Sequence, residues 1–286
     1  YVWLDGMEPK NLRSKVKYEE INISDPNQNP NIFQEILEQV SEWSFDGSST
    51  SQASVEKSNL VLKPVKVYAN PFTQRGSIPS FIIYCEVYNI DETPHETNSR
   101  YILRKYIDDN EKNDLVVAMD QEYVFWNSKF SIPSGWEGHN DPTLTIEPEN
   151  EGHYYCGLGG EVGAHRNLAD AHANVCYQAG IPLHSYNAGA LKSQWEYQIQ
   201  PANILKVADD LWISRFMLIR IAETRGLGIS FDSKPIEGDN NGSGCRVNFS
   251  TQKMTEEFSS DIDSYVVLMN LCEVLNEVDE KVLINA

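Results

Sequence analysis

Three segments of this chain are typical of β-strands that carry polar side chains on one face. Their sequences are LVVAMDQEYVFW (115–126), QWEYQIQ (194–200) and CRVNFS (245–250). Side chains point alternately to the two faces of a strand, so Asp120 and Glu122 are expected to share one face. The segments therefore predict an antiparallel sheet with a polar face.

The polar faces allow two interpretations. The three strands can be half-exposed, with their polar side chains in water, as antiparallel strands commonly are. Alternatively, the polar faces line a shared cleft. Two carboxylates at i and i+2, joined by a third such as Glu196, make an oxygen-ligand site typical of Mg²⁺ or Mn²⁺. The alternation of side chains does not decide between them.

The order of the predicted elements favours an α+β fold. Four β-rich runs and one helix come first, and longer helices mixed with strands follow. The β-rich runs are 1–5, 14–22, 58–65 and 81–89, and the early helix is 31–40. The later helices are expected over 167–180, 207–226 and 259–275, and a long loop over 129–151.

The polar segment 89–98 predicts a boundary between domains at 1–97 and 98–286, because it carries Pro94, several charges and no apolar period. In the helix over 207–226, Asp209 and Asp210 are expected in the first turn, where negative charge is favourable.

Charge and cysteine usage exclude several classes of protein. The formal net charge of −19 argues against nucleic-acid partners and against anionic membrane surfaces. No apolar run reaches the length of a membrane span. The five cysteines form no C-x-x-C pair, which predicts buried thiols in a reducing compartment. We expect an intracellular protein, and the sequence leaves cytoplasm and mitochondrion open.

A series of short motifs runs along the chain. It comprises WLDG (3–6), NLRSK (11–15), WSFDGSST (43–50), TPHETN (93–98), DQEY (120–123), YYCGLGG (154–160), DAHANVC (170–176), QWEYQ (194–198), FDSKP (231–235) and NGSGCRVNFST (241–251). In order and spacing the series resembles the eukaryotic-type glutamine synthetases and their short bacterial relatives. The resemblance implies an N-terminal β-grasp domain, a larger α+β catalytic domain, and two stacked rings with active sites between subunits. It also implies synthesis of glutamine from glutamate, ammonia and ATP with divalent metals.

The resemblance assigns metal ligands to three acids of this chain, and it also shows departures. Asp120 and Glu122 match the two acids of the family's E-x-E strand, and Glu196 matches the acid of its Q-W-E motif. Gly189 stands where the family has a further glutamate, and Arg246 stands where it has a histidine. We expect a weakened metal site.

Other positions of the family's site are kept. The resemblance makes Asp46 the ammonium-site acid, places the glutamate substrate at Asn241 and Gly242, and places a nucleotide phosphate at Ser250. The family's last metal ligand, its substrate arginines and its flap glutamate belong to a segment after residue 286. The resemblance therefore predicts a truncated catalytic domain.

These departures predict a glutamine synthetase-like pseudoenzyme that serves as a structural or accessory subunit of a larger protein assembly, present there as a single copy. Arg246 is expected to enter the old metal cluster and to replace the ion by salt bridges, unless it points to solvent. No cofactor is expected. The alternatives are an active glutamate–ammonia ligase, which would need ATP and Mg²⁺ or Mn²⁺, and a nucleotide- or amino-acid-binding module without turnover.

Overall fold

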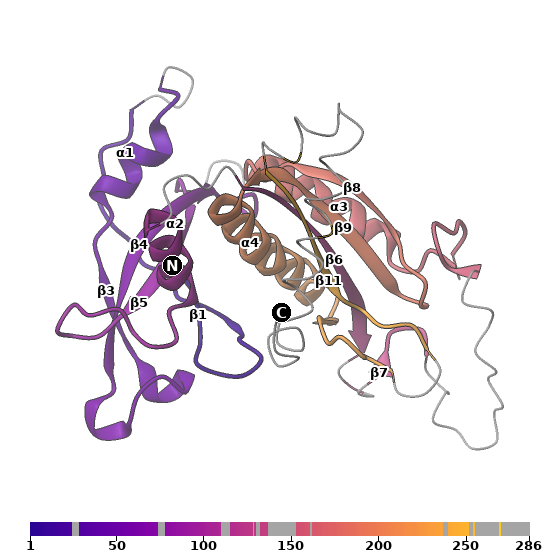
Figure 1. Cartoon of the computed structure of the whole chain (residues 1–286), viewed down its shortest axis with the longest axis horizontal. Helices are drawn as coiled ribbons and strands as arrows, with labels where there is room; N and C mark the ends of the chain where they lie inside the picture. The colour runs from indigo at the N-terminus through magenta and orange to yellow at the C-terminus, as the bar shows by residue number, and fades with distance from the viewer. Residues whose placement is uncertain are drawn as a thin grey trace.

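Two β-sheets lie on either side of helix α4 (Ile204–Glu223) in the computed structural model of this chain (Figure 1). The structure describes residues 1–24, 29–73, 78–109, 115–127, 129, 132–136, 153–160, 162–236, 240–251, 254 and 269. The helix predicted over 259–275 lies outside these residues except for Met269, and most of the loop predicted over 129–151 lies outside them too.

The small sheet is built from the first ninety residues. Its strands are β1 (Val2–Leu4), β2 (Leu12–Ser14), β3 (Trp43–Asp46), β4 (Asn59–Ala69) and β5 (Phe81–Tyr88), in the order β2-β1-β5-β4-β3. Among the pairs described in this sheet, β1–β5 is parallel and the others are antiparallel. Helix α1 (Ile32–Gln39) confirms the helix predicted here, and the turns η1 (Gly47–Thr50) and η2 (Val55–Lys57) follow β3.

One predicted strand of this region is wrong. The run 14–22 was expected to be a strand, but β2 ends at Ser14 and residues 15–24 belong to no strand. Its side chains do alternate between half-buried and exposed, with Val16 80% and Tyr18 82% exposed. An extended segment with alternating apolar residues can therefore have the sequence pattern of a strand without pairing with any strand that the structure describes.

The large sheet is antiparallel in every pairing described. Its strands are β6 (Val116–Asn127), β7 (Ile132–Pro133), β8 (Leu183–Ala188), β9 (Gln194–Asn203), β10 (Gly228–Ser230) and β11 (Cys245–Ser250). β6 is central: β9 pairs along one side of it, and β11 pairs along the other. The three segments that predicted a polar-faced antiparallel sheet are thus adjacent strands.

Helices α3 (Arg166–Gln178) and α4 pack against one face of the large sheet, and α2 (Ser99–Asp109) follows the small sheet. α4 is buried on several sides, as its composition predicted, because it lies between the two sheets. Asn203 caps its start by accepting a hydrogen bond from the backbone of Lys206, at 2.9 Å.

The expected place of Asp209 and Asp210 in the first turn of α4 is wrong, because the helix begins at Ile204. Both acids lie in the second turn and are almost fully buried. Arg100 of α2 binds Asp209 through two nitrogens, at 2.7 and 3.0 Å, and Lys66 of β4 reaches Asp210 at 3.0 Å. Ion pairs with distant segments, rather than the helix terminus, hold these charges.

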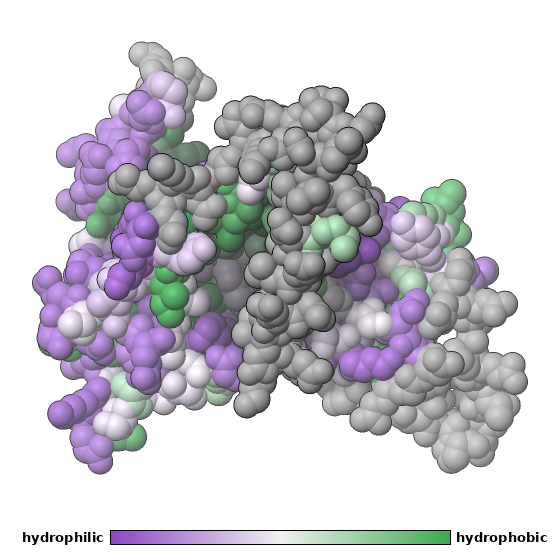
Figure 2. Space-filling view, viewed as in Figure 1, coloured by the Kyte–Doolittle hydropathy of each residue, from purple (hydrophilic) through white to green (hydrophobic). Residues whose placement is uncertain are grey.

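The main hydrophobic core is shared by both sheets. One face of the small sheet contributes Val2, Tyr68, Ile82 and Tyr84 to the same cluster as α3, α4 and the large sheet. The other face packs against α1 in a second cluster. On the face seen in Figure 2 the surface of the small-sheet half is mainly hydrophilic, as expected when its apolar side chains are turned inward.

The described elements confirm an α+β fold, while the β-grasp arrangement and the domain bounds 1–97 and 98–286 stay predictions. The four cysteines that the structure describes are free thiols; Cys85 and Cys176 are buried as predicted, but Cys156 is exposed, so the prediction of a buried thiol is wrong there. Within the described part of the chain, no helix is both long enough and apolar enough to cross a membrane.

Candidate functional site

Three carboxylates lie together on the face of the large sheet that points away from the helices. We call Asp120, Glu122 and Glu196 the acid cluster. Asp120 and Glu122 are two residues apart on β6, and Glu196 lies directly opposite Glu122 on β9. Residues of the other parity, such as Tyr123 and Tyr197, are buried in the core beneath. The strand pairing therefore brings together three acids that are distant in the sequence.

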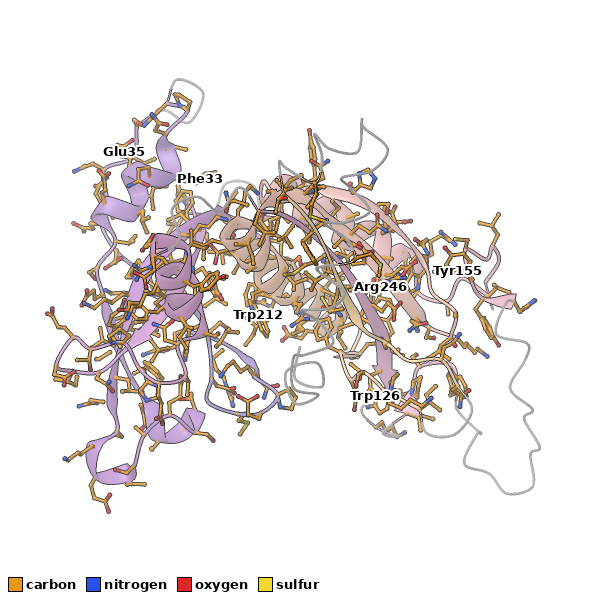
Figure 3. All side chains as sticks on the ribbon, in the orientation of Figure 1. Phe33, Glu35, Trp126, Tyr155, Trp212 and Arg246 are labelled. Atoms are coloured by element: carbon orange, nitrogen blue, oxygen red, sulfur yellow. The ribbon has the colours of Figure 1, made fainter. Side chains whose placement is uncertain are left out.

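Arg246 reaches into this cluster from β11, on the other side of β6, where its backbone lies opposite Asp120. The Nη2 atom of Arg246 lies 3.0 Å from Glu196 Oε2 and 3.6 Å from Glu122 Oε1, and its Nε atom lies 3.9 Å from Asp120 Oδ2. The guanidinium thus spans three strands. Figure 3 shows Arg246 over the large sheet, far from the labelled residues of α1.

The cluster is only partly shielded from water. The Arg246 side chain is 60% exposed, whereas the side chains of Asp120, Glu122 and Glu196 are 14%, 23% and 9% exposed. With one cation among three anions, the formal charge of the four groups is −2. An exposed guanidinium of this kind makes weaker ion pairs than a buried one, because water and salt screen it.

Further hydrogen bonds reach the three carboxylates from neighbouring strands and from the loop before β11. Asn187 of β8 donates to Glu196 Oε1 at 2.6 Å, and the backbone N–H of Gly244 donates to Glu122 Oε2 at 2.7 Å. Asn248 donates to Asp120 Oδ2 at 3.2 Å. Glu122 and Glu196 therefore have a partner at both oxygens, whereas both contacts of Asp120 fall on Oδ2.

As they stand, these residues do not fit a divalent cation. In the described residues no three His, Cys, Asp or Glu side chains are grouped so that they could hold a metal ion. Both oxygens of Glu196 have a donor, and the guanidinium of Arg246 lies between the acids. A cation would have to displace that group and break the bond from Gly244 to Glu122.

The glycine loop, residues 240–244, lies beside the acid cluster. Gln194 at the start of β9 donates to the carbonyl of Gly242 at 2.9 Å, and Ser243 N–H donates to the carbonyl of Ser233 at 2.9 Å. Asn241 is half-buried next to them. Two of the positions that the family resemblance gives to glutamate are therefore adjacent to the acids.

Ser250 is four residues beyond Arg246 on β11, where its backbone pairs with Val116. It lies at the opposite end of that strand from the glycine loop, and its hydroxyl donates to the carbonyl of Thr251 at 3.2 Å. The structure thus keeps Ser250 on the polar-faced strand without bringing it into the acid cluster.

Asp46 belongs to the other sheet. It ends β3 and caps the turn η1, where it accepts hydrogen bonds from the Ser48 and Ser49 hydroxyls at 2.7 and 2.8 Å. The Ser48 hydroxyl, followed by that of Ser49, lowers the pKa of this exposed carboxyl. Within one chain, the structure does not bring Asp46 to the acid cluster (Figure 1).

Two side chains of the site were not predicted from the sequence. Asn187 and Gln194 both contact predicted site positions, and both flank the turn between β8 and β9. The hairpin register, which places Asn187 opposite Glu196, is the signal that could have identified the first of them. Alternation along β9 places Gln194 on the same polar face as Glu196. It does not predict the contact of Gln194 with the glycine loop, which is distant in the sequence.

Comparisons with known proteins agree with the motif series. Residues 96–273 match the family model described as "Glutamine synthetase, catalytic domain". The chain is 37% identical over 257 residues to the glutamine synthetase of Yarrowia lipolytica, which covers 90% of this chain and 64% of that protein. The rat (Rattus norvegicus) glutamine synthetase is 35% identical over the same length, with 63% of it covered.

A bacterial relative extends the match. The glutamine synthetase of Streptomyces viridochromogenes is 36% identical over 263 residues, which are 92% of this chain and 70% of that protein. The resemblance predicted from the motifs is therefore confirmed. The chain spans less than two thirds of the length of the Yarrowia and rat relatives.

Proposed function

Because this chain belongs to the glutamine synthetase family, we propose that it serves as a structural or accessory subunit of a protein assembly, with Arg246 in the place of a divalent cation. The observation that carries this proposal is the contact of one guanidinium with all three acids, at 3.0, 3.6 and 3.9 Å. The site then retains its charges but has no metal with which to assist a phosphoryl transfer.

The electrostatics explain why the arginine matters. Transfer of a phosphoryl group needs cations that neutralise the phosphate and position the reactants. A guanidinium about 4 Å from a divalent ion opposes binding by about 2 kcal/mol in a water-like medium, and by more if the site is partly buried. About 2 kcal/mol corresponds to a loss of roughly 30-fold in affinity. Arg246 also neutralises part of the negative charge that would attract a metal.

A second function, glutamate–ammonia ligation, is favoured by the comparisons. Each relative named above is a glutamine synthetase, so on family membership alone an active ligase is the better-supported function. Three acids of the resemblance and the glycine loop are kept, and the exposed Arg246 side chain has room to turn outward. This function requires the cation to displace Arg246 and requires site residues that the relatives carry in the rest of their length.

Metal binding separates the two functions. We would titrate the protein and its Arg246→His variant with Mn²⁺ and follow the free ion by electron paramagnetic resonance. We expect the variant to bind Mn²⁺ at least 30-fold more tightly than the unchanged protein, because the repulsion is removed. Arg220→His, at an exposed arginine of α4 outside the cluster, is the matched control. Tight Mn²⁺ binding by the unchanged protein would reject the proposal.

An activity assay and a ligand titration complete the test. γ-Glutamyl transfer by the unchanged protein would identify an active ligase. Calorimetric binding of ATP or glutamate without turnover would identify a binding module, a third function motivated by the retained Asn241, Gly242 and Ser250.

The partner proposal is tested by mass. We propose other protein subunits as the partners, with one copy of this chain in the assembly, because a subunit that does not catalyse has no need of an active-site ring. Light scattering of the assembly isolated from its source is expected to show this stoichiometry. A stable homodecamer would contradict it.

A further inference from the structure

The core-facing side of β6 carries a buried amide next to aromatic side chains. Gln121 is 1% exposed and has the same parity along the strand as Tyr123 and Phe125, which lie in the main core. Its Nε2 donates to the backbone carbonyl of Glu122 and reaches the carbonyl of Gly244 at 3.4 Å. From the core side of the sheet, this amide therefore holds the backbone of one acid of the cluster and the end of the glycine loop.

Arg215 of α4 holds the other end of this amide. Its Nε donates to Gln121 Oε1 at 2.8 Å, and its Nη2 donates to the same oxygen. The guanidinium carbon lies 4.6 Å from the centre of the Trp212 ring and 5.0 Å from that of Phe231. A hydrogen bond from a charged donor is roughly twice as strong as a neutral one, and it polarises the amide so that its N–H groups become better donors. Arg215 therefore strengthens the bonds that Gln121 makes to the two carbonyls.

The same junction fixes the start of β11. The Glu122 N–H donates to the Gly244 carbonyl at 2.9 Å, and the Gly244 N–H donates to Glu122 Oε2 at 2.7 Å. Arg246 follows two residues later, with its backbone opposite Asp120. A shift of Gly244 along β6 would carry the guanidinium of Arg246 away from Glu196, which it reaches at 3.0 Å. The position of Gly244 therefore decides which acids Arg246 can contact.

We infer that Arg215 is a positioning residue for the acid cluster. It acts through Gln121, from the core side of the sheet, to hold Glu122 and Gly244 together, and in this way it aims Arg246 at the acids on the opposite face. The inference rests on the proposed function, since it concerns how Arg246 is brought to the acids. The alternative role for Arg215 and Gln121 is to stabilise the core without any effect on the loop.

Hydrogen exchange separates positioning from stabilisation of the core. Gln121→Glu keeps an acceptor for Arg215, which should hold the new carboxyl ionised at pH 7, but it removes the donor to the two carbonyls. We expect exchange at the Glu122 and Gly244 amides to become about tenfold faster. The Ser134 amide, which is hydrogen-bonded near the other end of β6, should keep its rate. Unchanged exchange at Glu122 and Gly244, or equal acceleration at all three amides, would overturn the inference.

Two substitutions of Arg215 grade the effect. Lysine keeps the charge but not the fork of donors, and methionine loses both, so exchange at Gly244 should be faster in Arg215→Met than in Arg215→Lys. Arg220→Met, on the same helix, is the matched control and should leave this exchange unchanged. Arg215→Lys keeps the test valid if the methionine variant does not fold. Exchange at Gly244 that is the same in Arg215→Lys as in the unchanged protein would overturn the inference.

A double-mutant cycle connects Arg215 to Arg246. In the Arg215→Lys background, where the charge is kept, Arg246→Met should lower Tm by less than half as much as it does in the unchanged protein, because Arg246 is no longer aimed at the acids. Equal losses of Tm would overturn the inference. Tight Mn²⁺ binding by the unchanged protein would instead reject the proposed function and leave the result of the exchange experiment standing.

Discussion

Replacing Arg246 by methionine removes the cation that contacts all three acids of the cluster and keeps a side chain of similar length. The formal charge of the cluster changes from −2 to −3. At 3.0 Å the nearest ion pair is worth about 1.4 kcal/mol in bulk water. Since the arginine side chain is 60% exposed, each pair is worth about 1 kcal/mol or less after its entropy cost and screening.

Summed over the three pairs, Arg246→Met is expected to lower the free energy of unfolding by about 1–2 kcal/mol, or Tm by about 2–5 °C, at low salt. The loss should shrink in high salt, because screening weakens both the pairs and the repulsion among the acids. Adding MgCl₂ in place of NaCl at equal ionic strength should raise the Tm of the variant and leave that of the unchanged protein as it was.

Differential scanning calorimetry measures these changes, and Arg220→Met is the control because that exposed arginine pairs with Glu223, away from the cluster. If Arg246→Met unfolds at the same temperature as the unchanged protein, with the same dependence on salt and Mg²⁺, then Arg246 does not neutralise the acids and the reasoning fails.

Three further predictions concern the core. Burial lowers the pKa of His172 to about 4, so the unfolded chain takes up a proton first as the pH falls. The free energy of unfolding should therefore decrease from pH 6.5 to 4 by about 3 kcal/mol, and urea titrations of His172→Gln should lose that dependence. Arg100→Gln removes the nearest ion-pair partner of the buried Glu86 and Asp209, which keep the longer pairs with Arg104 at 3.3 Å and Lys66 at 3.8 Å. It should cost up to about 3 kcal/mol in chemical denaturation, against under about 1 kcal/mol for Arg220→Gln; similar losses would contradict the buried network. Iodoacetamide should modify exposed Cys156 in the folded protein and spare Cys85, whose pKa burial raises to about 12, until the chain unfolds; mass spectrometry after digestion distinguishes the two.

Strand alternation predicted much of the site. It assigned Trp195, Tyr197 and Ile199 to one face, and all three are 1% exposed. It also assigned Asp120 and Glu122 to one face, where both meet Arg246. Such predictions succeed because the direction of a side chain in a strand depends only on position along that strand.

The alternation of side chains along one strand does not predict contacts between strands. The bond from Asn187 to Glu196 depends on the register of a hairpin, and the bond from Gln194 to Gly242 joins residues 48 positions apart. The start of α4 was misplaced for a related reason. Buried acids such as Asp209 look like favourable first-turn residues until their distant partner, Arg100, is known.

The small sheet has two buried faces with different neighbours, and one of these faces packs against the second half of the chain. Substitutions in the two halves of the chain should therefore depend on each other. Tyr68 and Tyr84 pack into the same cluster as α4, so a change of side-chain volume on either side must be matched on the other. Exchange of the first hundred residues with those of a distant relative would bring mismatched surfaces together. We expect the two halves to have accumulated substitutions in step, as the two sides of a permanent interface do.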